Sequence, residues 1–87
     1  MRIREGYSLS LVGNDYFVLE EGMDVSDNIY PLSDIAARVW EYVMERDFRV
    51  SSVAKFLTNE CDYDILTAQV NADEMVKEWL EAGFIEE

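Results

Sequence analysis

Few residues of this 87-residue chain could do chemistry. The chain contains no histidine and one cysteine, Cys61. Histidine is the commonest general base and a frequent zinc ligand, so the usual routes to acid–base catalysis and zinc binding are absent. Cys61 has neither a histidine nor a second cysteine to activate its thiol, so we interpret it as a helix-end residue beside the core. One cysteine also excludes an internal disulfide.

The acidic residues are numerous but scattered. Asp62 with Asp64, and Asp73 with Glu74, lack the spacing of a calcium-binding loop. Carboxylates near a helix start are more simply partners of the helix dipole, and the chain has no glycine-rich phosphate-binding loop. We therefore expect that the protein is not an enzyme and that it holds no metal and no cofactor. A small enzyme or metal protein, the alternative, would need a titrating cluster that this pattern does not supply.

A large negative charge restricts the partners of the protein. The chain carries 19 aspartate and glutamate residues against 7 lysine and arginine residues, a net charge of -12. Such a surface repels nucleic acids and anionic membranes, so we expect neither as a partner and favour one that is basic or neutral. Alternatively, the charge only keeps the protein soluble. Because no apolar run is long enough to span a membrane and residues 1–5 do not open a signal peptide, we expect a cytoplasmic protein.

The first third of the chain has the pattern of three strands. Residues 7–11 alternate large apolar and small polar side chains, which is the period of a half-buried strand. Gly13 and Asn14 suit a tight hairpin turn, and residues 16–19 read as the returning strand. Residues 28–32 form a third, short strand, which the simplest meander places at the outside of the sheet.

A proline in the third strand supports this outer placement. Pro31 has no N–H group and cannot donate to a ladder, so it is typical of an edge strand or a strand end. Such an edge can accept another chain; alternatively, Pro31 protects the edge from unwanted pairing. Because a free edge can also pair with a second copy, we expect a monomer or a weak homodimer.

Capping residues and helical periodicity indicate three helices after the strands. Their predicted bounds are Ser33 to about Arg46, Ser51 or Ser52 to about Asn59, and Asp64 or Thr67 to Gly83. After Gly83, Phe84 and Ile85 can fold back onto the core, whereas residues 1–5 are expected to be flexible. The sequence thus predicts an α+β fold, a three-stranded antiparallel sheet followed by three helices, winged-helix-like in its helical half.

Several short motifs follow one another at characteristic spacings. They are Leu32-Ser33 with Ala36, Val39 and Trp40; Val50 to Ala54 with Leu57; Tyr63-Asp64; and Val70, Ala72, Met75, Val76, Trp79, Gly83, Phe84 and Ile85. Their order resembles the PqqD-like family over about Tyr7 to Ile85. Three positions depart from the family pattern: Ser33 replaces a frequent Asn, Asn71 a frequent Asp, and Arg46-Asp47 a frequent Gly.

The resemblance implies what the chain binds. Residues 1–87 would form a single PqqD-like domain that recognises precursors of ribosomally made, post-translationally modified peptides. The leader segment of the precursor would add as a strand to the third strand, in the cleft beside the third helix. The second implied partner is a modifying enzyme, such as a radical SAM enzyme or a leader peptidase, to which the bound precursor is presented.

Binding by strand addition needs an open edge and pockets beside it. The predicted peptide-binding residues of the strand are Asn28, Ile29, Tyr30, Pro31 and Leu32. On the third helix, the predicted cleft wall is the flank of Asp73, Val76, Lys77 and Leu80. A peptide with apolar anchors and a basic residue near Asp73 would suit this groove. The opposite flank carries Asn71, Glu74 and Glu78, and Val76 and Leu80 are equally compatible with ordinary core positions.

A winged-helix transcription regulator is the alternative that the helix order permits. Its recognition helix would contact DNA through Lys or Arg, and the second predicted helix carries only Lys55. The net charge of -12 opposes this function as well.

Overall fold

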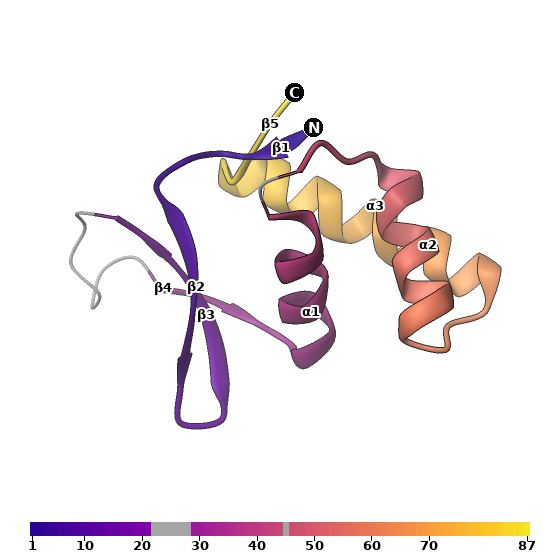
Figure 1. The fold of residues 1–87 in the computed structure, drawn as a ribbon, viewed down its shortest axis with the longest axis horizontal. Coiled ribbons are helices and arrows are strands. Elements are labelled where there is room, and N and C mark those ends of the chain that lie inside the picture. The colour runs from indigo at the N-terminus through magenta and orange to yellow at the C-terminus, as the bar shows by residue number, and fades with distance from the viewer. Residues whose placement is uncertain (22–28, 45) are drawn as a thin grey trace.

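The strands precede the helices along the chain, as the sequence predicts. The computed structural model describes residues 1–21, 29–44 and 46–87. Its elements are β1 (Arg2–Ile3), β2 (Tyr7–Val12), β3 (Asp15–Glu20), β4 (Ile29–Leu32), α1 (Asp34–Val43), α2 (Val50–Glu60), α3 (Ile65–Ala82) and β5 (Ile85–Glu86). Within the described residues, a three-stranded antiparallel sheet of order β2-β3-β4 is followed by three helices, which confirms the predicted α+β class (Figure 1).

A hairpin with a two-residue turn sets the register of the sheet. Gly13 takes a left-handed φ of +64°, which glycine adopts without strain, and Val12 pairs with Asp15 across the turn. β3 then pairs with β4, with Val18 opposite Tyr30. Val18 is 2 % exposed, so its side of the sheet faces the core.

Side-chain caps set two of the helix starts. The Ser33 hydroxyl accepts a hydrogen bond from the Ala36 N–H (3.1 Å), and the Asp64 carboxylate accepts one from the Thr67 N–H (2.9 Å). Ser33 is the predicted cap of the first helix, which is confirmed, and of the two predicted starts of the third helix, Asp64 and Thr67, the structure shows Asp64 as the cap. α3 is followed by Gly83 at a φ of +85°, the left-handed residue that the sequence predicts at this helix end.

Two helix boundaries differ from the prediction. α1 ends at Val43, before Arg46. α2 begins at Val50 after the extended Arg49, and Ser52 lies in its first turn, where the hydroxyl accepts a hydrogen bond from the Arg49 N–H (3.1 Å). Val50 packs against the core, so apolar contact at the helix start outweighs the preference for a serine cap. In the described part of the chain, no helix combines the length and the apolar character needed to cross a membrane.

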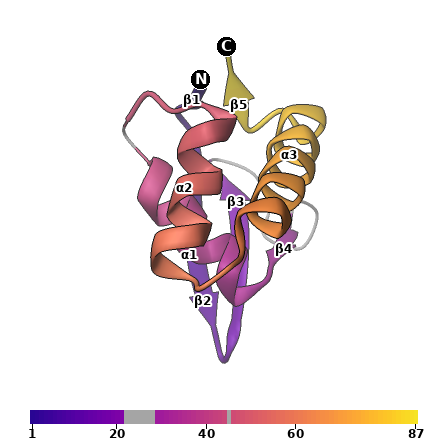
Figure 2. The same ribbon diagram turned by 90° about the vertical axis from the view of Figure 1, so that its right-hand side faces the viewer.

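An aromatic core joins the sheet to the helices. Trp40 of α1 and Trp79 of α3 are almost fully buried and meet edge to face, with ring centroids 5.3 Å apart. Phe84 follows α3 and contacts Tyr7 of β2, Tyr30 of β4 and Trp40, at centroid distances of 5.0, 4.9 and 5.6 Å. The predicted return of Phe84 onto the core is confirmed. Figure 2 shows α2 and α3 side by side in front of the sheet.

The two ends of the chain pair with each other, which the sequence does not predict. β1 and β5 form an antiparallel ladder with Ile3 opposite Ile85 (Figure 1). The Met1 amino group donates to the Phe48 carbonyl (2.8 Å), and the Phe48 N–H donates to the Met1 carbonyl (2.8 Å). The expectation that residues 1–5 are flexible is therefore wrong, because these bonds and the burial of Ile85 hold the segment in place.

Candidate functional site

β4 forms an open edge of the sheet, because β3 is its only strand neighbour in the described residues. Val12 and Asp15 flank a two-residue turn and therefore form a hydrogen-bonded pair, and such pairs alternate with non-bonded ones along an antiparallel ladder. Counted from this turn, the alternation predicts that Gly6 and Glu21 form a hydrogen-bonded pair. The Glu21 N–H does donate to the Gly6 carbonyl (2.6 Å). By the same alternation, the backbone N–H and C=O of Val18 point toward β4.

The backbone of Pro31 lies on the open side of β4. Val18 pairs with Tyr30, so the N–H and C=O of Tyr30 bond toward β3, while the backbone groups of Ile29 and Pro31 point away from the sheet. The edge therefore offers the Ile29 N–H and C=O and the Pro31 C=O, and lacks one donor because proline has no N–H. The prediction that Pro31 marks an edge strand is confirmed. Asn28, the first residue predicted for this strand, lies outside the described residues.

A cleft of about 200 Å³ lies between β4 and α3, beside the open edge. Its apolar lining comes from Tyr30 and Leu32 of β4, Ala36 of α1, and Met75 and Trp79 of α3. Ala36 and Trp79 are buried, and the other three side chains are half-buried with part of their surface toward the cleft. These five residues form the apolar floor of the cleft.

The polar wall of this cleft is acidic. Glu74 and Glu78, one turn apart on α3, are exposed and line the cleft together with Asn71. None of the residues that line it carries a positive charge. The charge of this flank also acts on the strand, because the pKa of Tyr30 is raised above its ordinary value by burial and then by Glu78 and Glu81. Glu74 and Glu78 form the acidic wall of the cleft.

The flank of α3 that faces β4 is not the predicted one. Asp73 lines a different cleft, between α2 and α3, and Lys77 is exposed without lining the β4 cleft. Val76 is 2 % exposed and belongs to the core, and Leu80 is half-buried against it. The α3 residues that line the β4 cleft are Asn71, Glu74, Met75, Glu78 and Trp79, and the predicted Asp73, Val76, Lys77 and Leu80 are not among them. Whether any of these α3 residues contacts a peptide stays a prediction. The peptide-binding role of Ile29, Tyr30, Pro31 and Leu32 stays a prediction.

The packing of α2 decides which flank of α3 turns toward β4. The buried stripe of α3 consists of Ala68, Ala72, Val76 and Trp79. At 3.6 residues per turn, residues 69 and 73 lie on one side of this stripe, and residues 71, 74 and 78 lie on the other. α2 packs on the first side, which leaves the second side to β4. The periodicity of the sequence reveals the stripe, but the choice between its sides depends on this contact between distant elements.

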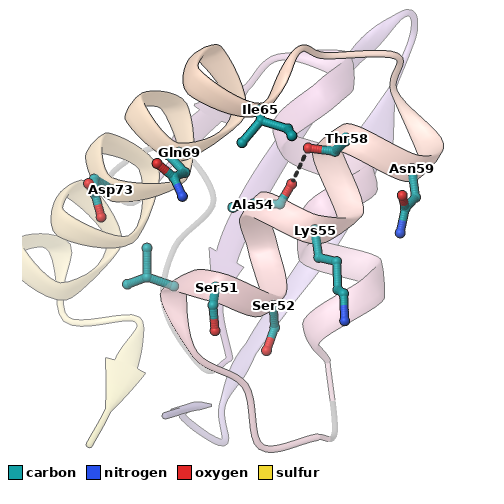
Figure 3. A pocket seen from close by; sticks show the side chains of 10 residues that line it. Ser51, Ser52, Ala54, Lys55, Thr58, Asn59, Ile65, Gln69 and Asp73 are labelled. Atoms are coloured by element: carbon teal, nitrogen blue, oxygen red, sulfur yellow. Dashed lines mark hydrogen bonds between the residues drawn. The ribbon is translucent and has the colours of Figure 1, made fainter.

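The α2/α3 cleft is larger, with a volume of about 680 Å³, and has a different character (Figure 3). Ser51, Ser52 and Lys55 line it from α2, and Gln69 and Asp73 line it from α3. Both walls are helices, which have no row of unpaired strand groups along their sides. This cleft therefore borders no open sheet edge, and we take the β4 cleft as the candidate site.

An open edge of a three-stranded sheet, beside a cleft whose other wall is the last of three helices, defines a small winged-helix-like α+β fold in the described residues. The chain belongs to the PqqD family: the family model described as coenzyme PQQ synthesis protein D (PqqD) matches residues 9–85. A comparison with curated proteins finds no match. Among solved structures, the chain is similar to TbiB1 in complex with the TbiA(beta) leader peptide. The TM-score is 0.75 at 14 % sequence identity, over 99 % of this chain and 95 % of the TbiB1 chain, a likeness of fold.

Proposed function

We propose that this protein binds the leader segment of a ribosomally made precursor peptide and presents it to a modifying enzyme. The leader adds as a further strand to β4, in the cleft beside α3, and this chain makes and breaks no bond itself. The observation that carries the proposal is the open edge of β4 next to the cleft. Membership of the PqqD family supports it, as does the leader peptide held by TbiB1, a protein of similar fold.

Backbone hydrogen bonds alone do not account for useful affinity. The guest strand accepts from the Ile29 N–H and donates to the carbonyls of Ile29 and Pro31. Each of these bonds contributes about 0.5–1.5 kcal/mol net, whereas association costs about 4–15 kcal/mol in lost translational and rotational freedom. The side chains of the guest must therefore supply most of the binding free energy.

The cleft is placed to receive those side chains. Successive residues of an extended chain point to opposite faces, so every second guest residue faces α3. These residues meet the apolar floor, where Leu32 and Met75 are half-buried and have surface left to cover. Burial of apolar surface contributes about 25 cal/mol per Å², so one or two guest side chains whose apolar parts cover this floor contribute about as much as the backbone bonds.

Delivery follows from binding at an edge. A guest strand on β4 enters and leaves at the ends of the cleft, so the precursor beyond its leader stays accessible to an enzyme. A radical SAM enzyme or a leader peptidase is the kind of partner that would act on it. We expect the rate of precursor modification in a reconstituted reaction to fall whenever leader binding to β4 falls.

A titration of the isotope-labelled protein with a synthetic leader tests the proposal. The probe is the leader of a short precursor encoded beside the gene of this protein. We expect amide shifts at Ile29, Tyr30 and Leu32 and at positions 71, 74, 75 and 78 of α3. The exchange of the Ile29 N–H with solvent should slow, because it acquires an acceptor.

A leader of the same composition in scrambled order is the control for this titration. Amide shifts confined to Ser51, Lys55 and Gln69 would instead place the binding site in the α2/α3 cleft. Unchanged amides of Ile29, Tyr30 and Leu32 at saturating leader would contradict strand addition.

A further inference from the structure

The lining of the β4 cleft indicates which side chains its guest carries. The cleft holds two carboxylates, Glu74 and Glu78, no cation, and the apolar floor between them and the strand. We propose that the guest segment carries Lys or Arg at two alternate positions, i and i+2, on its α3-facing side. This inference rests on the proposed function, because it describes the guest of the same cleft.

The spacing of the two carboxylates matches the repeat of an extended chain. Glu74 and Glu78 are four residues apart on α3, which separates them by about 6 Å along the helix axis. In an extended strand, residues i and i+2 point to the same face and lie about 6.6 Å apart. In a guest strand that runs along α3, two alternate residues can therefore each reach one carboxylate, whereas neighbouring guest residues point to opposite faces.

The floor favours long basic side chains over short ones. The aliphatic stem of a Lys or Arg can cover Met75 while its charged end reaches Glu74 or Glu78. Both carboxylates are exposed, so an ion pair with them keeps its contact with water and the desolvation cost stays small. An acidic guest residue at either position meets like charge.

The position of the charge distinguishes recognition in the cleft from general attraction. A net charge of -12 attracts any basic peptide from a distance. The acidic wall instead requires basic residues with one residue between them. The guest residue that donates to the Pro31 carbonyl fixes where this pair lies along the edge.

Selection from a displayed peptide library tests the inference. The probe is a library of random segments of about ten residues, long enough to cover an edge strand. The full chain is compared with the E74K/E78K variant and with the charge-matched control E60K/D73K. The control residues are exposed and lie outside the β4 cleft, and both variants raise the net charge by four units, two for each replacement.

We expect the unchanged chain and the control to enrich Lys or Arg at i and i+2, and E74K/E78K to lose this pattern or to enrich Asp and Glu there. For a synthetic peptide with the pattern, E74K/E78K should raise Kd about tenfold, since two weak ion pairs become repulsive. The control should change Kd by less than about twofold. An E74Q/E78Q variant, which keeps side-chain shape, should lose the basic preference without gaining an acidic one.

Two results would overturn the inference and leave the proposed function standing. In the first, selected peptides slow the exchange of the Ile29 N–H but carry no alternate basic residues. In the second, E74K/E78K and E60K/D73K weaken the basic preference equally, which is the effect of total charge. Peptides that bind without changing any β4 amide would overturn the inference and the proposed function together.

Discussion

Pro31 presents a carbonyl and no N–H to the open side of the sheet. A guest chain can still donate to this carbonyl and accept from the Ile29 N–H. A second copy of β4 that paired with this edge would bring the same missing donor, so a pair of identical edges lacks two bonds. Pro31 therefore weakens pairing between two copies of β4 more than it weakens pairing with a guest chain. An edge that accepts a guest and an edge protected from self-pairing are compatible interpretations of Pro31.

Replacing Pro31→Ala should tighten guest binding, because the open edge gains one donor. One added hydrogen bond of about 0.5–1.5 kcal/mol lowers Kd about two- to tenfold, measured by calorimetry with a peptide selected on the unchanged chain. The free protein should lose a little thermal stability, because alanine leaves the unfolded chain more freedom. An unchanged affinity would contradict the outward orientation of residue 31.

The opposite change, Ile29→Pro, should weaken binding of the same peptide, because it removes an N–H donor from the open edge of β4. Its N–H does not bond to β3, and the first position of a strand tolerates proline, so the sheet should remain folded. Calorimetry should show Kd rising about two- to tenfold. A variant that unfolds would instead indicate that this N–H belongs to the β3 ladder, and circular dichroism distinguishes the two outcomes.

Residue type reveals local structure better than it reveals a cleft. Ser33, Asp64 and Gly83 could be predicted because capping depends on a side chain and the few backbone groups beside it. The sequence does not predict that Glu74, and not Asp73, lies beside β4. These two neighbouring acidic residues of α3 differ only in which distant element they face.

At the scale of elements, the start of α3 depends on a charged cap. The pKa of Asp64 lies below its ordinary value of 3.8, chiefly because the carboxylate accepts from the Thr67 N–H and then from the Thr67 hydroxyl, with a smaller effect of the Leu66 N–H. The lowered pKa means that the charged cap stabilises the folded state above the ordinary pKa. This stabilisation is lost as the pH falls through the lowered value.

An Asp64→Asn variant isolates this effect, because asparagine also caps helices but does not titrate. We expect the unfolding free energy of the unchanged chain to exceed that of the variant near neutral pH. The difference should shrink as the pH falls below about 4. Urea unfolding across an acidic pH series measures it, and a difference that does not vary with pH would contradict the assigned cause.

The elements also differ in how visible they are in the sequence. β2 and β3 each span six residues, and the alternation and turn that predict them lie within a short stretch. β1 and β5 have two residues each, too few for any period, and they pair across almost the whole chain. Their pairing follows from the path of the folded chain and has no local signal.

For the whole molecule, Phe84 is a contact that joins the sheet to the helices. Its ring meets Tyr7, Tyr30 and Trp40, which belong to β2, β4 and α1. Because Tyr30 also lines the β4 cleft, the shape of the cleft depends on this contact. Truncation of Phe84 should affect both stability and binding.

A Phe84→Ala variant should lose about 3–5 kcal/mol of unfolding free energy. A domain of this size has a total of about 4–13 kcal/mol, so the variant should lose a large share of its stability and unfold at a clearly lower denaturant concentration. Phe56→Ala is a matched control, because Phe56 is half-buried and stacks on Tyr42 away from the sheet. Denaturant titrations of both variants measure the difference, and equal losses would contradict the role assigned to Phe84.

The net charge should make the thermal stability of the whole domain depend on salt. Arg2 and Asp47, both exposed and 3.9 Å apart, form the one ion pair within the described residues, so most carboxylates repel one another without local compensation. Raising NaCl from about 0.01 M to about 0.15 M shortens the screening length from about 30 Å to about 8 Å. We expect Tm to rise over this range in a thermal melt; a fall would show that attractive pairs outweigh the repulsion.

The antiparallel ladder of β1 and β5 places Arg2 opposite Glu86, so the first and last residues lie on the same side of the molecule (Figure 1). A short linker between Glu87 and Met1 should therefore close the backbone into a ring, and new ends could be opened at the turn of Gly13 and Asn14. A cargo domain fused to either end of this chain would start from nearly the same point. Engineers could thus exchange amino-terminal and carboxy-terminal fusions without changing where the tether begins.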